Sequence, residues 1–348
     1  MLKSLNINGL VAQFPIVQGG MGVGISMSKL AGAVAAQGGI GTISAAQPGF
    51  NWEGFSNNPL KANLEALSHH IKKAKEMASD GVVGVNIMCA ITNYADYVKC
   101  AVESGADLIV SGAGLPTQLP GLLKGSATKI APIVSSKKAA SVILKMWDKK
   151  FGQTADMLVI EGPKAGGHLG FSTEELENDI DYDIEIKNIL QEVAKYEDQY
   201  GRTIPTVFAG GVYDRADINH YVDLGCAGVQ IATRFVATEE CDADDGFKNA
   251  YIQAKEEDVT IVKSPVGMPG RALNNDFIQG LLIEAKKITE CNSCIQGCNP
   301  KNIPYCITRA LINSAVGKTN EGLVFCGAYV DKIKEMSTVK RIFGELTS

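Results

Sequence analysis

Short β-branched, apolar runs recur along the chain, and a helix-like stretch follows each of them. The runs are almost continuously apolar, as expected for parallel strands that are buried on both faces. The pattern predicts eight strands, at Phe14–Gln18, Gly41–Ser44, Val82–Met88, Asp107–Gly112, Ile130–Ser135, Met157–Gly162, Ile204–Gly210 and Gly228–Phe235. It predicts helices between them, at Ser28–Gln37, Pro59–Ser79, Asn93–Ser104, Pro116–Lys124, Lys137–Lys150, Asp183–Tyr200 and Asp214–Leu224.

Strands that alternate with helices form βαβ units and a parallel sheet. Eight such units predict an α/β fold, a (β/α)8 TIM-type barrel, and an open flavodoxin-like sheet is the alternative. The Rossmann phosphate fingerprint is missing, because neither Gly20–Gly24 nor Gly39–Gly41 completes G-x-G-x-x-G. Two long strand-to-helix loops, Ala45–Asn58 and Pro163–Asp181, belong to the barrel face that holds active sites.

The segment after the eighth strand has a different pattern. We expect a helix at Asp245–Lys255 and another at Asp276–Thr289, followed by a cysteine-rich segment and a tail to Ser348. We therefore divide the chain into a barrel domain, residues 1–275, and a C-terminal helical extension with a cysteine cluster, residues 276–348.

Composition and charge exclude several classes of protein. The chain has 348 residues, of which 45% are hydrophobic and 20% charged, enough apolar material for a large core and too much for wholesale disorder. Its net charge of −5 creates no general attraction for nucleic acid or anionic membranes. No apolar run is long enough to span a bilayer, and the first 20 residues do not resemble a signal peptide. We expect a cytoplasmic location.

A histidine among glycines is the clearest candidate for chemistry. The sequence Glu161-Gly-Pro-Lys-Ala-Gly-Gly-His168-Leu-Gly170 begins at the end of the sixth predicted strand. The glycines, Gly166 and Gly167 among them, leave room for a flat ligand against the backbone, and imidazole titrates near neutral pH. His168 is therefore a candidate acid or base, although a loop histidine bonded to a nearby carbonyl is the plainer interpretation.

Glycine-rich turns at three other strand ends complete the predicted site. Gly210-Gly211 ends the seventh strand, and Gln230-Ile-Ala232-Thr233 runs through the eighth, where barrels often bind phosphate. Gly20-Met21 ends the first strand, so a ring can lie against its backbone. Asn86 and Ser111–Gly114 end the third and fourth strands, and they are candidate polar contacts to that ring or simple helix caps.

Five segments together resemble the nitronate monooxygenase (2-nitropropane dioxygenase) family, which includes flavin-type enoyl-acyl-carrier-protein reductases. They are Gln18-Gly-Gly-Met21, Val85-Asn86, Ala165-Gly-Gly-His168-x-Gly170, Ile204-Pro-Thr-Val-Phe-Ala-Gly-Gly211 and Gly228-Val-Gln-x-Ala-Thr-Arg-Phe235. The resemblance covers about Leu10 to Asn275. It implies a TIM-type barrel that binds FMN without a covalent bond.

The resemblance also implies a role for each matching position. His168 would be the catalytic acid or base. The cofactor-binding residues would be Gly20, Met21, Asn86, Glu161, Gly166, Gly167, Gly210, Gly211, Gln230, Ala232 and Thr233. Two positions depart from the family pattern: Lys164 replaces an acidic residue, which reverses a charge near the site, and Ala232 replaces a frequent glycine.

The cysteine spacing predicts a metal or redox site outside the barrel. Cys291, Cys294, Cys298 and Cys306 lie within sixteen residues, in the order C-x2-C-x3-C-x7-C. A zinc site usually has two separate C-x2-C pairs, and only one is present. The compact start resembles the [4Fe-4S] segment of other FMN barrels, of the dienoyl-CoA reductase type. Zinc, and a reduced cysteine-rich turn without metal, are the alternatives.

These features lead to one preferred function and two alternatives. We expect an FMN-dependent oxidoreductase that oxidises nitronates or nitroalkanes, with His168 as acid or base beside the flavin. The first alternative is an NAD(P)H-dependent enoyl-thioester reductase that also uses FMN, and the second is a phosphate-binding barrel without flavin. The expected partners are a small-molecule substrate, NAD(P)H in the reductase case, and a second copy of the chain in a homodimer; no nucleic acid or membrane is expected.

Overall fold

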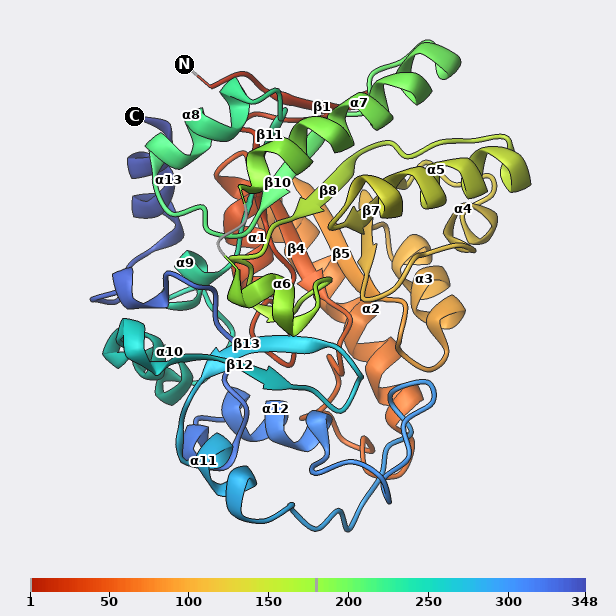
Figure 1. The fold of residues 1–348 in the computed structure, drawn as a ribbon. Helices are drawn as coiled ribbons and strands as arrows, with labels where there is room; N and C mark the ends of the chain where they lie inside the picture. Colours follow the sequence, from red (N-terminus) through yellow and green to blue (C-terminus); the bar gives the residue numbers. More distant parts are fainter. Residues whose placement is uncertain (1, 179–180) are drawn as a thin grey trace.

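In the computed structural model, which describes residues 2–178 and 181–348, eight parallel strands close into a barrel (Figure 1). All eight were predicted, so the TIM-type barrel is confirmed and the open sheet was wrong. The strands are β3 (Ile16–Gln18), β4 (Ile40–Ser44), β5 (Val82–Met88), β6 (Leu108–Gly112), β7 (Lys129–Val134), β8 (Leu158–Glu161), β10 (Thr206–Ala209) and β11 (Gly228–Ile231). Neighbours along the chain are neighbours in the barrel, and β11 closes it against β3.

The helices that surround the barrel also follow the sequence pattern. They are α1 (Ser28–Ala36), α2 (Pro59–Ala78), α3 (Tyr94–Glu103), α4 (Leu119–Leu122), α5 (Lys137–Phe151), α7 (Tyr182–Tyr200) and α8 (Arg215–Asp223). Their ends are set by local chemistry. Asn58 caps α2 by accepting a hydrogen bond from the Lys61 amide, and Gly152 ends α5 in a left-handed conformation at φ 63°.

Two elements end earlier than predicted. The eighth strand stops at Ile231 instead of Phe235, because the chain turns at Ala232 into the short helix α9 (Thr233–Val236). The helix predicted at Asp276–Thr289 ends as α11 (Asp276–Ile283), and the chain then continues without regular structure. The predicted helix at Asp245–Lys255 is present as α10 (Asp245–Gln253).

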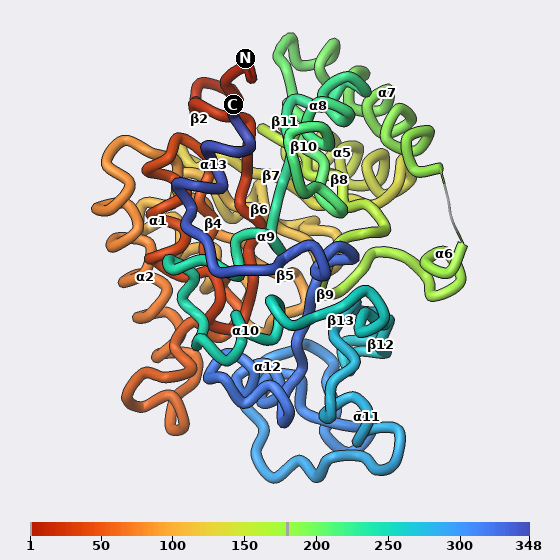
Figure 2. Tube along the Cα trace, turned by 90° about the vertical axis from the view of Figure 1, so that its left-hand side faces the viewer, coloured from red at the N-terminus to blue at the C-terminus, as the bar shows by residue number. Residues whose placement is uncertain are grey.

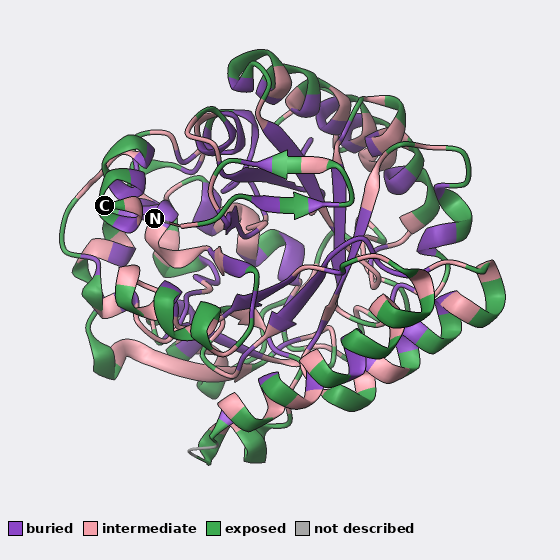
Figure 3. Cartoon of the chain, turned by 90° about the horizontal axis from the view of Figure 1, so that it is seen from above, coloured by how far each residue is buried: buried purple, intermediate pink, exposed green. Residues whose placement is uncertain are grey.

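A hairpin closes the end of the barrel opposite the C-terminal extension. It consists of β1 (Leu5–Ile7) and β2 (Leu10–Ala12), which the sequence pattern did not predict. Leu5 and Ile7 are almost fully buried against Val17 and Ile40 of the barrel interior. Figure 3 shows the buried strands at the centre and exposed helix faces around them.

The other end of the barrel is covered by the later part of the chain (Figures 1 and 2). A three-stranded antiparallel sheet joins β12 (Val259–Lys263), β13 (Pro269–Leu273) and the two-residue β9 (Gly167–His168), which belongs to the loop after β8. α6 (Thr173–Glu177) lies in the same loop, whose positions 179–180 lie outside the described residues.

The chain then passes through α12 (Ile307–Ala315) and returns along the barrel to α13 (Val339–Thr347). α13 packs against α1 and α8, so the last residues lie near the first (Figure 2). The boundary between two domains at residue 275 stays a prediction. No helix in the described part of the chain is long and apolar enough to cross a membrane.

Candidate active site

One cavity of about 250 Å³ opens at the C-terminal ends of the barrel strands. Every residue to which the family resemblance gave a catalytic or cofactor-binding role lines it, whereas the candidate contact Ser111 does not, since it is fully buried and donates to the Ile87 carbonyl. The residues with these roles are Gly20, Met21, Asn86, Glu161, Gly166, Gly167, His168, Gly210, Gly211, Gln230, Ala232 and Thr233. These residues come from loops up to about 210 positions apart in the chain, and barrel closure brings them together.

His168 is held in the cavity wall by the antiparallel sheet. It is paired with Gly270 of β13 in the ladder, and its Nε2 atom lies 2.7 Å from the Ser264 Oγ atom. The ring packs edge-on against Phe325, with ring centroids 4.9 Å apart. Burial lowers the pKa of His168 to about 4, because the charged imidazolium would lose its solvation. The imidazole is therefore neutral at pH 7 and able to accept a proton.

The pKa of the Glu161 carboxyl group is shifted in the opposite direction. It ends β8, and its Oε2 atom accepts a hydrogen bond from the Gly170 amide at 2.9 Å. Burial raises the pKa of Glu161 to about 7, although that hydrogen bond opposes the shift. The site therefore contains a carboxyl group that takes up a proton at a higher pH than an exposed glutamate does.

Two polar side chains in the cavity have no internal partner. The amides of Asn86 and Gln230 line the cavity, and neither makes a hydrogen bond with the residues that the structure describes. Both residues are half-buried, so their amide groups are open to the cavity and able to bond a ligand there. By contrast, Gln18 is a structural residue, because its Oε1 atom accepts a hydrogen bond from the Thr42 amide at 2.9 Å.

The glycines beside these side chains are required mainly by packing. A Cβ atom at Gly20 would lie 2.3 Å from the Cβ atom of Asn86, and one at Gly166 would lie 2.6 Å from the backbone of Cys326. The close approach expected at Gly20 and Gly166 is therefore an approach to this protein's own atoms. Asn86 and Cys326 pack directly against the backbone of these glycines, and that backbone forms part of the cavity surface.

The end of β10 forms a glycine turn beside the end of β11. Gly210 and Gly211 have φ angles of +110° and +80°, a conformation that favours glycine. Within the described ranges, the amides of Gly210 and Gly211 donate to no other group. Thr233 begins α9 beside them. Unpaired amides next to a hydroxyl suit a phosphate group.

The C-terminal segment Phe325–Tyr329 closes the cavity, and sequence reasoning missed this contribution. The Gly327 amide donates to Thr233 Oγ1 at 3.0 Å, and the Ala328 amide donates to the Lys164 carbonyl at 3.1 Å. Lys164 Nζ also lies 2.7 Å from the Tyr329 hydroxyl. No motif marks this segment, because it reaches the site only through the return of the chain.

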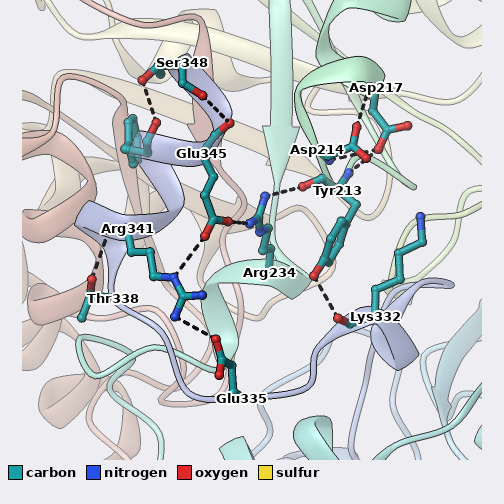
Figure 4. A network of polar contacts seen from close by, with 12 residues as sticks. Tyr213, Asp214, Asp217, Arg234, Lys332, Glu335, Thr338, Arg341, Glu345 and Ser348 are labelled. Atoms are coloured by element: carbon teal, nitrogen blue, oxygen red, sulfur yellow. Dashed lines mark hydrogen bonds and ion pairs between the residues drawn. The ribbon is translucent and has the colours of Figure 1, made fainter.

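A polar network holds the returning chain outside this wall (Figure 4). Arg234 donates to the Tyr213 carbonyl at 2.7 Å and forms an ion pair with Glu345 of α13. The Tyr213 hydroxyl donates to the Lys332 carbonyl at 2.9 Å. Since Arg234 and Tyr213 also line the cavity, the network ties the cavity wall to the last helix.

Arg271 is a second residue that sequence reasoning missed. Its buried guanidinium donates to the carbonyls of Pro163 and Ala165, in the loop that carries His168. Arg271 lies on β13, next to the residue that pairs with His168. It therefore fixes the loop from behind, and no local signal distinguishes such an arginine from a surface one.

The cavity fits a planar group with an anionic tail. Thioether and small side chains (Met21, Met88, Ala113), the amides of Asn86 and Gln230 and the turn at Gly210–Gly211 all line it. These are the features that the residues of an FMN site need: an apolar face for a ring, polar contacts for its rim and donors for a phosphate. The residues present therefore fit the cofactor expected from the sequence.

The four clustered cysteines lie outside this cavity and form no disulfide. In the part of the chain that the structure describes, no group of three or more His, Cys, Asp or Glu side chains is arranged to hold one metal ion. The structure therefore confirms neither of the metal sites expected for these cysteines, the [4Fe-4S] cluster or zinc.

Comparisons with known proteins agree with this geometry. Residues 3–348 match the family described as nitronate monooxygenase. A Mycobacterium tuberculosis enzyme, (3aS,4S,5R,7aS)-5-hydroxy-7a-methyl-1-oxo-octahydro-1H-indene-4-carboxyl-CoA dehydrogenase, is 26% identical over 269 residues, 77% of this chain but only 65% of the relative. A probable nitronate monooxygenase of Staphylococcus saprophyticus is 25% identical over 308 residues, 80% of this chain and 81% of the relative. The structure of FabK from Thermotoga maritima is 25% identical, covers 97% of this chain and 92% of its own, and has a TM-score of 0.73.

Proposed function

The chain belongs to the nitronate monooxygenase family, and from this premise we propose that it is an FMN-dependent oxidoreductase that acts on nitroalkanes or their nitronates. One observation carries the proposal: a single cavity holds a neutral histidine, unpaired amides and a glycine turn. The first relative's match spans less than two thirds of that protein, so its substrate is not transferred to this chain.

We assign the binding of FMN to the residues already described. The turn at Gly210–Gly211 and the Thr233 hydroxyl would hold the phosphate, and the amides of Asn86 and Gln230 would contact the edge of the ring. When bound, FMN supplies the two-electron redox chemistry that no side chain provides. The protein supplies orientation and an environment shielded from water.

His168 would remove the acidic proton from the carbon next to a nitro group. A general base must be unprotonated, and the lowered pKa of His168 keeps its imidazole neutral throughout the physiological range. If Nε2 donates its proton to Ser264 Oγ, the lone pair of Nδ1 is free for the substrate proton. Confinement against the cavity wall would then orient the substrate carbon toward this nitrogen.

The first test compares His168→Ala with His220→Ala, a control that removes an exposed histidine of α8. We expect both variants to bind FMN, as measured by their visible absorption. His168→Ala should lose turnover of a neutral nitroalkane by roughly 10²- to 10⁴-fold, the usual contribution of a general base. Turnover of the preformed nitronate, which has already lost that proton, should fall much less.

Each part of the proposal has its own contrary result. Full turnover of the neutral nitroalkane by His168→Ala would reject the base role of His168. A colourless protein that takes up no FMN on reconstitution would reject the flavin and would favour the phosphate-binding barrel.

A second function, the reduction of a conjugated enoyl thioester by NAD(P)H, has one specific observation in its favour. Lys164 places a cation at the cavity rim, where it can attract the phosphates of a carrier or a nucleotide. The name of the Mycobacterium tuberculosis relative specifies a CoA thioester. His168 would then give a proton to the α-carbon, a role for which its low pKa is less suited.

Anaerobic stopped-flow absorbance separates the two functions. Rapid flavin bleaching by NADH, with none by nitroalkane or nitronate, would decide for the reductase. Flavin bleaching by nitroalkane or nitronate, with none by NADH, would decide for the oxidation of nitroalkanes or nitronates. The homodimer and the use of NAD(P)H stay predictions.

A further inference from the structure

A second cavity is lined by residues of the C-terminal extension. Its volume is about 370 Å³, within the range of about 300–1,000 Å³ that small-molecule sites occupy. Its walls come from α11, from α12, from the short helix η2 (Thr319–Glu321) and from residues 286–290, which have no regular structure. Neither the cofactor nor the substrate proposed above uses this space.

The second cavity is separate from the active site, although α12 contributes to both. Leu311 of α12 lines the cavity of His168, whereas Ala310 and Asn313 line the second cavity. The two cavities share no lining residue. An α-helix has 3.6 residues per turn, so these positions lie on different faces of the helix. A ligand in the second cavity is therefore not a ligand of the active site.

Hydrogen bonds hold the walls of the second cavity together. The Lys286 amide donates to the Pro304 carbonyl at 2.8 Å, which fixes the irregular segment beside the start of α12. The side-chain amide of Asn313 donates to the Glu321 carbonyl at 3.0 Å, which fixes η2 to the same helix. The cavity is therefore a defined part of the fold.

Tyr305 brings a buried hydroxyl group without a partner to this cavity. The residue is 2% exposed, and its ring packs edge-on against Phe277, with ring centroids 5.2 Å apart. Both residues line the cavity. Among the described residues, no group forms a hydrogen bond with the Tyr305 hydroxyl. Burial raises the pKa of Tyr305, so the phenol keeps its proton and is a free donor for a ligand oxygen.

The lining of the cavity has an excess of positive charge. Three cationic residues, Lys286, Lys287 and Arg309, line it together with two carboxylates, Glu290 and Glu321. Arg309 and Glu290 form an ion pair at 2.5 Å and offset one another. Lys286 and Lys287 have no such partner in the part of the chain that the structure describes. The remaining charge on the lining is one positive unit, which suits a single negative charge on a ligand.

We propose that this cavity binds a small organic monoanion, a carboxylate on a compact apolar body. The ammonium groups of Lys286 and Lys287 attract the carboxylate, and one of its oxygens accepts the hydrogen bond that the Tyr305 hydroxyl does not make within the protein. The apolar body packs against Phe277 and Ile288. The proposal does not depend on the flavin or on the reaction assigned above.

The test is calorimetric titration of the full-length protein with 4-bromobenzoate in the presence of excess FMN. We expect a dissociation constant below about 1 mM, a normal affinity for a ligand of this size. The uncharged 4-bromobenzamide has nearly the same shape and should bind roughly tenfold more weakly, because it lacks the charge that the lysines attract. In crystals soaked with 4-bromobenzoate, the anomalous signal of bromine should lie in the cavity beside Phe277.

Substitutions separate the contributions to binding. Tyr305→Phe removes only the unpaired hydroxyl, so it should weaken the binding of 4-bromobenzoate by about fivefold and should not lower the urea midpoint of the free protein. The double variant Lys286→Gln/Lys287→Gln should weaken binding by roughly tenfold. Its matched control is Lys72→Gln/Lys73→Gln, which removes two adjacent exposed lysines of α2 that line neither cavity and should leave the affinity unchanged.

Several outcomes would overturn the anion site. They are no binding in solution at millimolar concentrations, equal affinity for 4-bromobenzoate and 4-bromobenzamide, bromine found only in the cavity of His168, or unchanged affinity in both Tyr305→Phe and the Lys286–Lys287 double variant. Circular dichroism shows whether each variant is folded. A protein that takes up no FMN but binds 4-bromobenzoate beside Phe277 would reject the flavin and retain the anion site, so the two failures can be told apart.

Discussion

The contact between His168 Nε2 and Ser264 Oγ, 2.7 Å long, is the closest link between the proposed base and a buried side chain. Ser264 lies directly after β12, so the same sheet that carries His168 also positions its partner. The hydroxyl can donate or accept, so the contact fixes the orientation of the ring and leaves Nδ1 as the nitrogen without this partner. Ser264 is thus a positioning residue.

Ser264→Ala should keep FMN and lower the turnover of a neutral nitroalkane by about tenfold, as expected for the loss of one hydrogen bond. The matched control is Ser126→Ala, which removes a serine that bonds Thr128 far from the cavity. Turnover and its pH profile report the effect. An unchanged rate and profile in Ser264→Ala would mean that packing alone orients His168.

The raised pKa of Glu161 predicts how the free energy of unfolding depends on pH. Its pKa is 4.5 when unfolded and about 7 when folded, so the folded protein binds the extra proton between these values. The stabilising effect of that proton is complete below pH 4.5 and is lost as pH rises through 7. Glu161→Gln should remove this loss, so the variant should gain stability relative to wild type between pH 5 and 8. Urea unfolding of both proteins without FMN measures it, and parallel pH curves would contradict the assignment.

At the scale of elements, the β1–β2 hairpin acts as a plug for the barrel. Its inward side chains, Leu5 and Ile7, fill the space that the strands leave at the end opposite the active site. Inward and outward side chains alternate along the hairpin, and Val11 of β2 points outward with 52% exposure. The plug adds to the stability of the barrel and not to the site.

Ile7→Ala should therefore lower the free energy of unfolding by about 2–5 kcal/mol, because it opens a cavity in a core that cannot fully collapse. Val11→Ala, on the exposed side of the same hairpin, should change it by less than about 0.5 kcal/mol. Urea midpoints measure both. If the two substitutions have equal effects, the hairpin does not seal the barrel.

At the scale of the whole molecule, the return of the chain completes the cavity. The returning segment reaches the cavity wall, where Lys164 donates to the Tyr329 hydroxyl at 2.7 Å. Arg234 and Glu345 join the same end to α13 (Figure 4). The extension and the barrel thus share one site.

Tyr329→Phe should weaken the retention of FMN by roughly fivefold, since it removes about 1 kcal/mol of hydrogen bonding and keeps the ring. Tyr200→Phe is the control, because the Tyr200 hydroxyl donates to Asp148 of α5 and neither residue lines the cavity. Dialysis followed by flavin fluorescence measures the dissociation rate. Equal rates for the two variants would show that the returning segment does not secure the cofactor.

The sequence by itself determined the barrel, and it pointed to twelve of the residues that line its cavity. Short β-branched runs such as Val82–Met88 indicate strands buried on both faces, and eight successive βα units predict a barrel in which neighbours along the chain pair, as β4, β5 and β6 do. Catalytic loops follow strand ends, so His168 and Gly210 were identifiable from local pattern alone.

Only the tertiary structure decided which distant segments complete the site. Ser264, Arg271 and Phe325–Tyr329 carry no local signal, because their roles depend on antiparallel pairing with β9 and on the return of the chain. The low pKa of His168 and the high pKa of Glu161 also depend on the tertiary structure, because burial causes both shifts. Desolvation is a property of the packed surroundings, and no residue's neighbours along the chain specify it.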